Sequence, residues 1–224
     1  MNVQVVFADW YKTLSASLFW QQQPGCRLSA ADSGKVESYI FSRGDLLRSW
    51  MLGCATAEDV CSQAAGDLGL AAADLLADLE HSCCTMEYYD PGSVEALRAV
   101  RKQGIKVVLA TDNMDAFTRW TVPALQLNGI FDAILDSASI GSLKNDLVDG
   151  YSPFFGPWLS DQRITPANAV LIDDSPPASA AAIGLQTRLV EHPGQVATIL
   201  TQLGLALGTG APATPRHDQP GGKS

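Results

Sequence analysis

Short apolar runs that alternate with helix-like segments restrict the fold of this chain more than any other feature. The clearest runs lie at 3–8 (VQVVFA), 105–110 (IKVVLA) and 168–172 (NAVLI), and weaker ones lie at 132–136 and 186–190. Short runs rich in β-branched residues are typical of strands that are buried on both faces of a parallel sheet. We therefore expect these segments to form the sheet of the molecule.

Helical patterns separate these runs. Residues 91–104 begin with a turn-forming Pro-Gly pair, carry apolar residues at helical spacing and end on glycine. Residues 113–129 predict two short helices broken near Pro123, because proline interrupts helical hydrogen bonding. A further helix is predicted at 152–162. The alternation predicts an α/β, Rossmann-like core with a mostly parallel sheet and helices on both faces.

The stretch from residue 15 to residue 89 differs from the rest of the chain. After its first residues it has no convincing strand pattern, and amphipathic patterns lie at 36–52, 56–70 and 71–89. We therefore expect a small all-helical domain, inserted into the α/β core just after the first strand.

The predicted domain organisation follows from these patterns. Residues 1–14 and 90–207 would form the α/β core, and residues 15–89 the helical domain. Residues 208–224 are rich in Gly, Pro and polar side chains. Such a segment cannot bury enough apolar surface to fold, so we expect a disordered tail.

The formal net charge of −9 restricts the possible partners. Nucleic acid and acidic membranes both require a basic surface, so neither is expected. A small anionic substrate remains compatible, because a few local cations can set the field inside a cleft. A monomer and a homodimer are both compatible with the sequence.

The lengths of the apolar runs and the pattern of cysteines indicate in which cellular compartment the protein is expected. No apolar run approaches the roughly 18 residues that a membrane span requires. The start of the chain lacks the pattern of an export signal. The five cysteines lack metal-ligand spacing, as expected for reduced thiols in a cytoplasmic protein.

Polar residues that could take part in catalysis or ligand binding follow the predicted strands. In an open parallel sheet, ligands bind beyond the carboxyl ends of the strands, so these side chains are expected to meet at one edge. An aspartate at a strand tip can attack phosphorus or an electrophilic carbon and form a covalent intermediate. A hydroxyl and a lysine can hold an anionic group, and an acidic pair can bind Mg²⁺ or position water. The set comprises Asp9, then Thr111, Asp112 and Asn113, then Lys144, and finally Asp173 and Asp174.

These motifs, in this order, resemble the haloacid dehalogenase (HAD) superfamily of hydrolases, and the resemblance runs from residue 3 to about residue 190. It implies that the helical domain closes over the site as a cap and sets the choice of substrate. It also implies the roles of individual residues. Asp9 in VVFADWYKTL would be the nucleophile, Thr111 in VVLAT would bind the anionic oxygens of the substrate, Lys144 would neutralise charge, and Asp173 and Asp174 in VLIDD would bind Mg²⁺ together with Asp9 and the backbone carbonyl of Tyr11.

Tyr11 departs from the pattern of the family's phosphatases, which have a general-acid aspartate at this place. A tyrosine, with an ordinary pKa of about 10, cannot do the same work near neutral pH. The family's 2-haloacid dehalogenases do have tyrosine there, because halide leaves without a proton. They lack the paired acids found here as Asp173 and Asp174, and use no metal.

Three functions are therefore compatible with the sequence. The first is Mg²⁺-dependent hydrolysis of a small phosphorylated metabolite with a good leaving group. The second is metal-independent 2-haloacid dehalogenation. The third is a non-catalytic binding protein that keeps the HAD fold.

Further site residues follow from the resemblance. Asp112, Asn113 and Lys144 are expected to contribute to substrate binding. Arg43, or else Arg48, would correspond to the cap arginine with which the dehalogenases hold a substrate carboxylate. Lys12 stands where both branches usually have glycine, and a solvated lysine is the simpler interpretation. Taken singly, the aspartates and Thr111 could also be ordinary helix caps.

Overall fold

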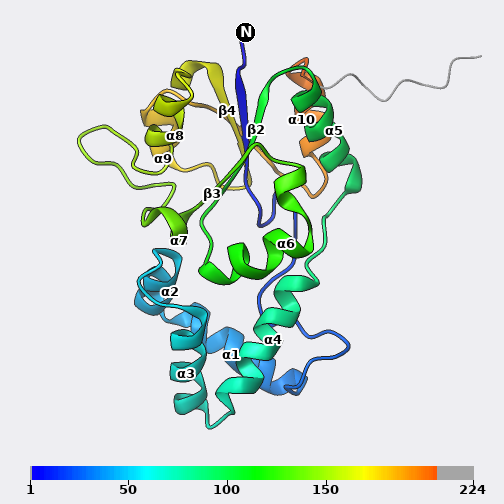
Figure 1. The fold of residues 1–224 in the computed structure, drawn as a ribbon, viewed down its shortest axis with the longest axis vertical. Coiled ribbons are helices and arrows are strands. Elements are labelled where there is room, and N and C mark those ends of the chain that lie inside the picture. Colours follow the sequence, from blue (N-terminus) through cyan, green and yellow to red (C-terminus); the bar gives the residue numbers. More distant parts are fainter. Residues whose placement is uncertain (1, 206–224) are drawn as a thin grey trace, which may run out of the picture.

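The computed structural model describes residues 2–205 and contains a five-stranded, all-parallel sheet in the order β3-β2-β1-β4-β5 (Figure 1). The five predicted strand segments are confirmed, with ends within two residues of the prediction. The strands are Val5–Ala8 (β1), Lys106–Thr111 (β2), Ala133–Asp136 (β3), Ala169–Asp173 (β4) and Gln186–Leu189 (β5).

The strand order places β1 in the centre of the sheet. After β1 the chain adds β2 and β3 on one side, and then crosses over to add β4 and β5 on the other. In sheets of this kind, a crevice for ligands forms outside the carboxyl ends of the strands where the order reverses, here between β1 and β4. The backbone N–H of Asp9 donates to the carbonyl of Ile172 at 3.0 Å, so the residue that follows β1 is held against β4.

Both faces of the sheet are buried, and alternate residues of each strand serve opposite faces. In β1, Val6 and Ala8 belong to one apolar cluster, whereas Val5 and Phe7 belong to the other. This explains why the strands form continuous apolar runs in the sequence. Helices α5 (Pro91–Lys102) and α10 (Val196–Gln202) cover the first face, and α8 (Gly156–Asp161) and α9 (Ala178–Ala182) the second (Figure 1).

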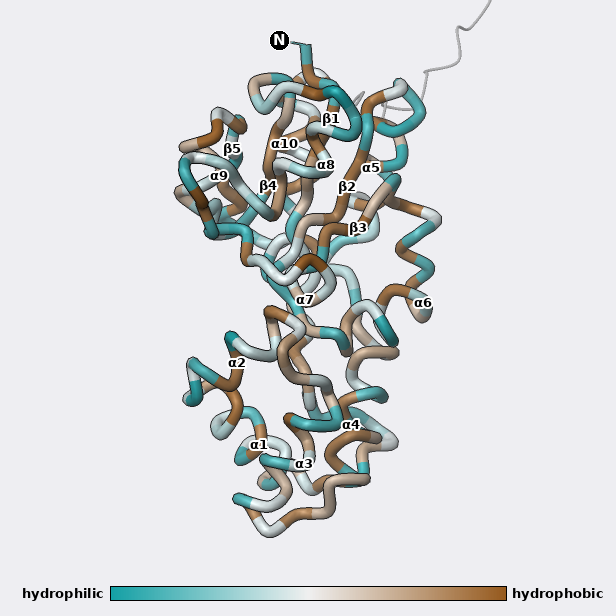
Figure 2. The backbone as a smooth tube through the Cα atoms, turned by 60° about the vertical axis from the view of Figure 1, so that its left-hand side comes forward, coloured by the Kyte–Doolittle hydropathy of each residue, from teal (hydrophilic) through white to brown (hydrophobic). Residues whose placement is uncertain are grey.

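Four helices form a separate unit below the carboxyl ends of the strands (Figure 1). Figure 2 shows the strands as largely hydrophobic and this unit as a mixture of hydrophobic and hydrophilic residues. We call residues 15–89 the helical insert; its exact boundaries as a domain stay a prediction. Its helices are α1 (Ala30–Ser42), α2 (Gly44–Met51), α3 (Ala57–Leu68) and α4 (Ala72–Cys84).

Two chain segments join the helical insert to the core, and they lie side by side. The backbone N–H of Tyr89 donates to the carbonyl of Leu14 at 2.9 Å, and the Ser15 hydroxyl donates to the carbonyl of Glu87 at 2.6 Å. Because both segments are tied together, the insert is attached through a paired connection rather than through two independent linkers.

Further contacts hold the insert against the core. The indole N–H of Trp50 donates to Asp115 Oδ1 at 2.6 Å. Gly53 has a φ of 69°, and a Cβ there would lie only 2.2 Å from the carbonyl oxygen of Ala138. This position therefore requires glycine for both its backbone conformation and its close approach to the core.

Two helix predictions in the insert need correction. The pattern at 36–52 does not form one helix, because Arg43 leaves helical geometry, with φ of −104° and ψ of 81°, before α2 starts at Gly44. Glycine is a poor residue for a helix interior, which favours a break at this place. The pattern at 71–89 ends as a helix at Cys84, and the remaining residues form the connection back to the core.

The helix predictions for the core need two similar corrections. The chain at 113–129 does break near Pro123, as predicted, but not at the proline itself: a π-helical turn (Phe117–Thr121) continues directly into α6 (Val122–Ala124). Proline is tolerated near the start of a helix, where its missing N–H has no required partner. The break lies at Gln126, whose φ is 52°. The predicted helix at 152–162 is shorter in the structure. Only α8 (Gly156–Asp161) is helical, and turns precede it.

Two further observations complete the fold. Among residues 2–205, no helix combines the length and apolar character that crossing a membrane would require. The predicted disordered tail, 208–224, lies outside the described residues.

Candidate active site

Three carboxylates meet at the crevice between β1 and β4. Asp9 follows β1, Asp173 is the last residue of β4, and Asp174 follows it. One carboxylate oxygen from each residue lies within 4.8 Å of the others. Asp9 and Asp173 are buried, and Asp174 is partly exposed. Negative charges held this close in a buried site repel one another strongly, so the cluster requires cations.

Lys144 supplies one of these cations. Its ammonium group donates to Asp9 Oδ1 at 2.8 Å and to Asp173 Oδ2 at 2.7 Å, and its side chain is buried with them. The loop that carries Lys144 is fixed on both sides. Its backbone N–H donates to Asp112 Oδ1 at 2.8 Å, and its carbonyl accepts a hydrogen bond from the Ser179 hydroxyl. Both of these contacts to Lys144 come from the core.

Burial and charge shift the pKa values of this cluster. Burial raises the pKa of Asp9 to about 6, with Lys144 opposing the shift and Asp173 adding to it. Burial also raises the pKa of Asp112, and burial together with Asp173 raises the pKa of Asp174. Burial alone would lower the pKa of Lys144, but the charges of Asp9 and Asp173 raise it overall. Lys144 thus stays charged throughout the neutral range.

Thr111 and Asn113 lie at the end of β2, the strand next to β1. Thr111 is the last residue of that strand and is buried. The side-chain amide of Asn113 donates to Thr111 Oγ1 at 3.5 Å, and its backbone N–H donates to Ser137 Oγ at 2.9 Å. Since β2 neighbours β1 directly, both residues are placed at the same edge as Asp9.

Lys12 and Thr13 explain how the chain turns after Asp9. Lys12 has a φ of 60°, in the left-handed region that glycine adopts most easily, which accounts for the glycine usual at this place. Its side chain is exposed, with the ammonium group 5.3 Å from the centre of the Tyr11 ring. The Thr13 hydroxyl accepts a hydrogen bond from the backbone N–H of Asp174 at 3.0 Å. This contact ties the turn to the acidic pair, and sequence reasoning did not identify it.

Comparisons with known proteins bear on the fold. No protein-family model and no curated protein matches the chain. Solved structures do match. A HAD family enzyme from Bacteroides thetaiotaomicron, crystallised as a magnesium complex, is 13% identical with a TM-score of 0.67, over 90% of this chain and 100% of that chain. A predicted HAD-like family hydrolase from Porphyromonas gingivalis is 14% identical with a TM-score of 0.67, over 91% and 98%.

An L-2-haloacid dehalogenase from Xanthobacter autotrophicus matches as well. It is 17% identical with a TM-score of 0.58, over 94% of this chain and 85% of that chain. The chain has a HAD-like fold. The expected fold class is therefore confirmed.

The acidic cluster of this HAD-like fold suits a hard divalent cation. Mg²⁺ prefers oxygen ligands, and three carboxylates from two neighbouring strand ends offer them within a small volume. The residues present therefore fit the ion. That the backbone carbonyl of Tyr11 also binds the Mg²⁺ ion stays a prediction.

Arg43 and Arg48 of the helical insert are paired with acids outside this cluster. Arg43 pairs with Asp67 at 3.2 Å and stacks over the ring of Tyr39, with 4.2 Å between the guanidinium carbon and the ring centre. Arg48 lies 3.6 Å from Asp146, which belongs to the Lys144 loop. Neither arginine lines the cavities described below, so the structure does not bring Arg43 together with the other expected site residues.

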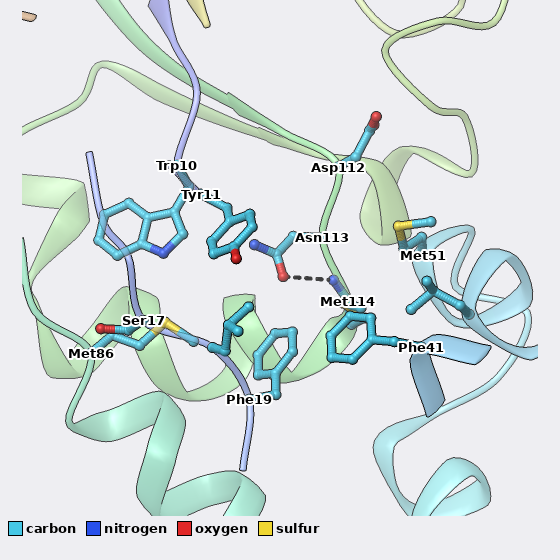
Figure 3. A pocket seen from close by; sticks show the side chains of 12 residues that line it. Trp10, Tyr11, Ser17, Phe19, Phe41, Met51, Met86, Asp112, Asn113 and Met114 are labelled. Atoms are coloured by element: carbon cyan, nitrogen blue, oxygen red, sulfur yellow. Dashed lines mark hydrogen bonds between the residues drawn. The ribbon is translucent and has the colours of Figure 1, made fainter. Parts of the chain in front are cut away.

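Two adjoining cavities surround the site. An open, polar depression is lined by Asp9, Lys144 and the acidic pair, among others. A second cavity, of about 190 Å³, lies between the core and the helical insert and is mostly apolar (Figure 3). Asp112 lines both, so the two lie next to each other at this residue. We call the second one the apolar cavity. Sequence reasoning missed it, because its walls come from separate segments with no common motif.

Proposed function

We propose that the chain is a hydrolase that uses Asp9 as a covalent nucleophile and, with Mg²⁺, releases phosphate from a small phosphorylated compound. The observation that carries this proposal is the cluster of Asp9, Asp173 and Asp174, with Lys144 bridging two of its members. A buried carboxylate at the centre of the sheet edge, kept ionised by a lysine, is a suitable nucleophile. The similar HAD family enzyme from Bacteroides thetaiotaomicron has also been crystallised in complex with magnesium and inorganic phosphate.

In the first step, an oxygen of Asp9 attacks phosphorus. The new bond joins Asp9 to the phosphoryl group, and the ester bond breaks, so that the alcohol oxygen leaves with the bonding electrons and takes a proton from solvent. In the second step, water attacks the same phosphorus, phosphate is released, and the Asp9 carboxylate is restored. Both steps are displacements at phosphorus, and neither requires an oxidant or reductant.

The remaining residues would support these steps. Lys144 offsets the charge of Asp9 and of the incoming anion, while the Thr111 hydroxyl and the Asn113 amide are neutral donors for phosphoryl oxygens. Mg²⁺, when bound by the acidic cluster, would screen the phosphoryl charge from the carboxylates. The helical insert covers this edge of the sheet, where it would act as the cap.

Tyr11 favours a second candidate function, 2-haloacid dehalogenation, in which Asp9 attacks carbon and halide leaves. Burial, Asp174 and Glu37 all raise the pKa of Tyr11, so its hydroxyl is a poor proton donor for an alcohol leaving group. The paired acids and the positions of Arg43 and Arg48 speak against this function, because no arginine of the insert lines the cavities around Asp9.

A substrate panel tests the proposal. An aryl phosphate, an acyl phosphate, an alkyl phosphate and a 2-haloacid are each assayed with Mg²⁺ and with a chelator. Release of phosphate that depends on Mg²⁺ and is lost in the Asp9→Asn variant would support the proposal. Release of halide without metal would support the dehalogenase instead. Inactivity on every compound, with no covalent adduct at Asp9, would point to a binding protein.

A further inference from the structure

The apolar cavity differs from the site at Asp9 in the character of its walls. Eight of its twelve lining residues are apolar, and three more are uncharged. Figure 3 shows aromatic and methionine side chains from both the insert and the core around it. They include Phe19, Phe41, Met51, Met86 and Met114.

No lysine or arginine lines the apolar cavity in the described part of the chain. Its single charged wall residue is Asp112, which is negative when ionised. A second anionic group on a ligand would therefore find no cationic partner in this cavity, and any loss of its hydration would be uncompensated. Arg43 and Arg48, the nearest candidates by sequence, are paired with Asp67 and Asp146 instead.

The volume of the cavity limits what can fill it. A cavity of about 150 Å³ in another protein, lined by similar side chains, stays dry and binds benzene. At about 190 Å³, this cavity is large enough for one aromatic ring with a small substituent. Methionine side chains are flexible and adapt to aromatic ligands, which suits Met51, Met86 and Met114 to such a wall.

Neutral donors complete the wall. The indole N–H of Trp10 is buried and has no hydrogen-bond partner among the described residues. Tyr11 and Asn113 also reach the cavity from the core (Figure 3). The Tyr11 hydroxyl and the Asn113 amide are neutral donors for an uncharged oxygen on a ligand. These groups cannot neutralise a second negative charge.

We infer that the non-phosphate part of the substrate is one uncharged, apolar group of about the size of a substituted phenyl ring, and that it occupies the apolar cavity. The inference rests on the proposed function, because the phosphoryl group is placed at Asp9. Since Asp112 lines both cavities, they are neighbours, and the inference places the two parts of one small molecule on either side of this residue. Sugar phosphates, bisphosphates and phosphorylated carboxylic acids are excluded as good substrates.

Binding to the apolar cavity can be measured without any reaction. Three of the four methionines of the chain line it. The full chain is labelled with ¹³C-methyl methionine, and the signals are assigned with Met51→Leu, Met86→Leu and Met114→Leu variants. Benzyl alcohol should shift the three cavity signals with saturation, whereas glycerol at the same concentration should not. Equal responses to both compounds, or none to either, would overturn the inference.

Hydrolysis then links the cavity to the reaction. Benzyl phosphate and glycerol 3-phosphate both release a primary alcohol, and we expect kcat/KM to favour the benzyl ester by about 10- to 100-fold. Phe41→Lys and Met51→Lys should remove most of this preference; both residues are partly exposed, so the chain tolerates the change. Val148→Lys, on an exposed loop away from the cavity, is the matched control.

The two proposals fail in different ways. If neither ester nor the aryl and acyl phosphates of the panel are hydrolysed but benzyl alcohol still shifts the methionine signals, the proposed reaction is wrong and the cavity assignment stands. If both esters are hydrolysed at equal kcat/KM, the reaction stands and the inferred substrate class is wrong.

Discussion

The ammonium nitrogen of Lys144 lies 2.8 Å from a carboxylate oxygen of Asp9, and 2.7 Å from one of Asp173. All three side chains are buried. Lys144 therefore places a positive charge between two neighbouring acids, and this relationship supports both the stability of the site and its proposed chemistry.

Replacing Lys144 by Met should destabilise the chain in the absence of Mg²⁺. Removing one partner of a buried ion pair typically costs about 3–5 kcal/mol, because the other charge is left uncompensated. Urea denaturation followed by circular dichroism measures this change. The exposed Lys12 is the matched control, and Lys12→Met should change the free energy of unfolding by no more than about 0.5 kcal/mol. Equal, small effects of both variants would contradict the role given to Lys144.

Asp9→Asn should abolish hydrolysis while leaving the fold intact. The amide keeps the shape of the carboxylate but is not a nucleophile, and loss of a covalent catalyst typically costs many powers of ten in rate. Rates on the best substrate of the panel are compared with the wild type, and the circular dichroism spectra of both are recorded. Activity within about tenfold of the wild type would show that Asp9 is not the nucleophile.

Mg²⁺ should raise the melting temperature of the wild type. A ligand that binds only the folded state adds about 2.7 kcal/mol of stability at a hundred times its dissociation constant. The double variant Asp173→Asn, Asp174→Asn should lose this response, because it keeps only one carboxylate of the cluster. Melting is followed with and without millimolar Mg²⁺, with Na⁺ at equal ionic strength as the control. A wild type that does not respond would favour the metal-free dehalogenase.

Tyr11→Asp should raise the turnover of alkyl phosphates. A positioned general acid is typically worth about 10² to 10⁴ in rate, and Tyr11 cannot supply it. Aryl and acyl phosphates should gain less, because their leaving groups need no proton. Tyr11→Phe is the control, since it removes the hydroxyl without adding an acid. If the chain is a dehalogenase, Tyr11→Asp should lower halide release instead, because it places a second negative charge near Asp9.

The ion pair between Glu58 of α3 and Arg119 of the core should contribute to stability only above acidic pH. The hydrogen bond from Arg119, at 2.8 Å, lowers the pKa of Glu58 to about 2. A lowered pKa means that the contribution is complete above the ordinary value near 4.5 and is lost as the pH falls toward 2. Both side chains are more than two-fifths exposed, so we expect at most about 1 kcal/mol.

Urea denaturation of the wild type and of Glu58→Gln, between pH 3 and pH 7, measures this contribution. The difference between the two should be constant from pH 7 to pH 5 and shrink below that. Glu95→Gln, at an exposed position of α5, should show no such dependence. A difference that grows as the pH falls would contradict the assignment of the pair.

Local sequence patterns were sufficient to predict the sheet. Strands buried on both faces require continuous apolar runs, and helices with one buried face require apolar residues at helical spacing. Both signals are local, which is why β1 to β5 lie where they were expected. The helix breaks at Arg43 and Gln126 were missed, because the apolar periodicity continues across both places; Gly44 was the one local signal for the first break.

The sequence by itself determined which residues could meet at the edge of the sheet. Asp9, Thr111 and Asp173 stand at strand ends, and the geometry of a parallel sheet brings such ends together. Only the tertiary structure decided what their partners are. It placed Lys144 between two acids, paired Arg43 with Asp67 away from the site, and enclosed the apolar cavity. The physical reason is that these contacts join segments far apart in the chain, so their distances depend on the packing of the insert and loops against the sheet.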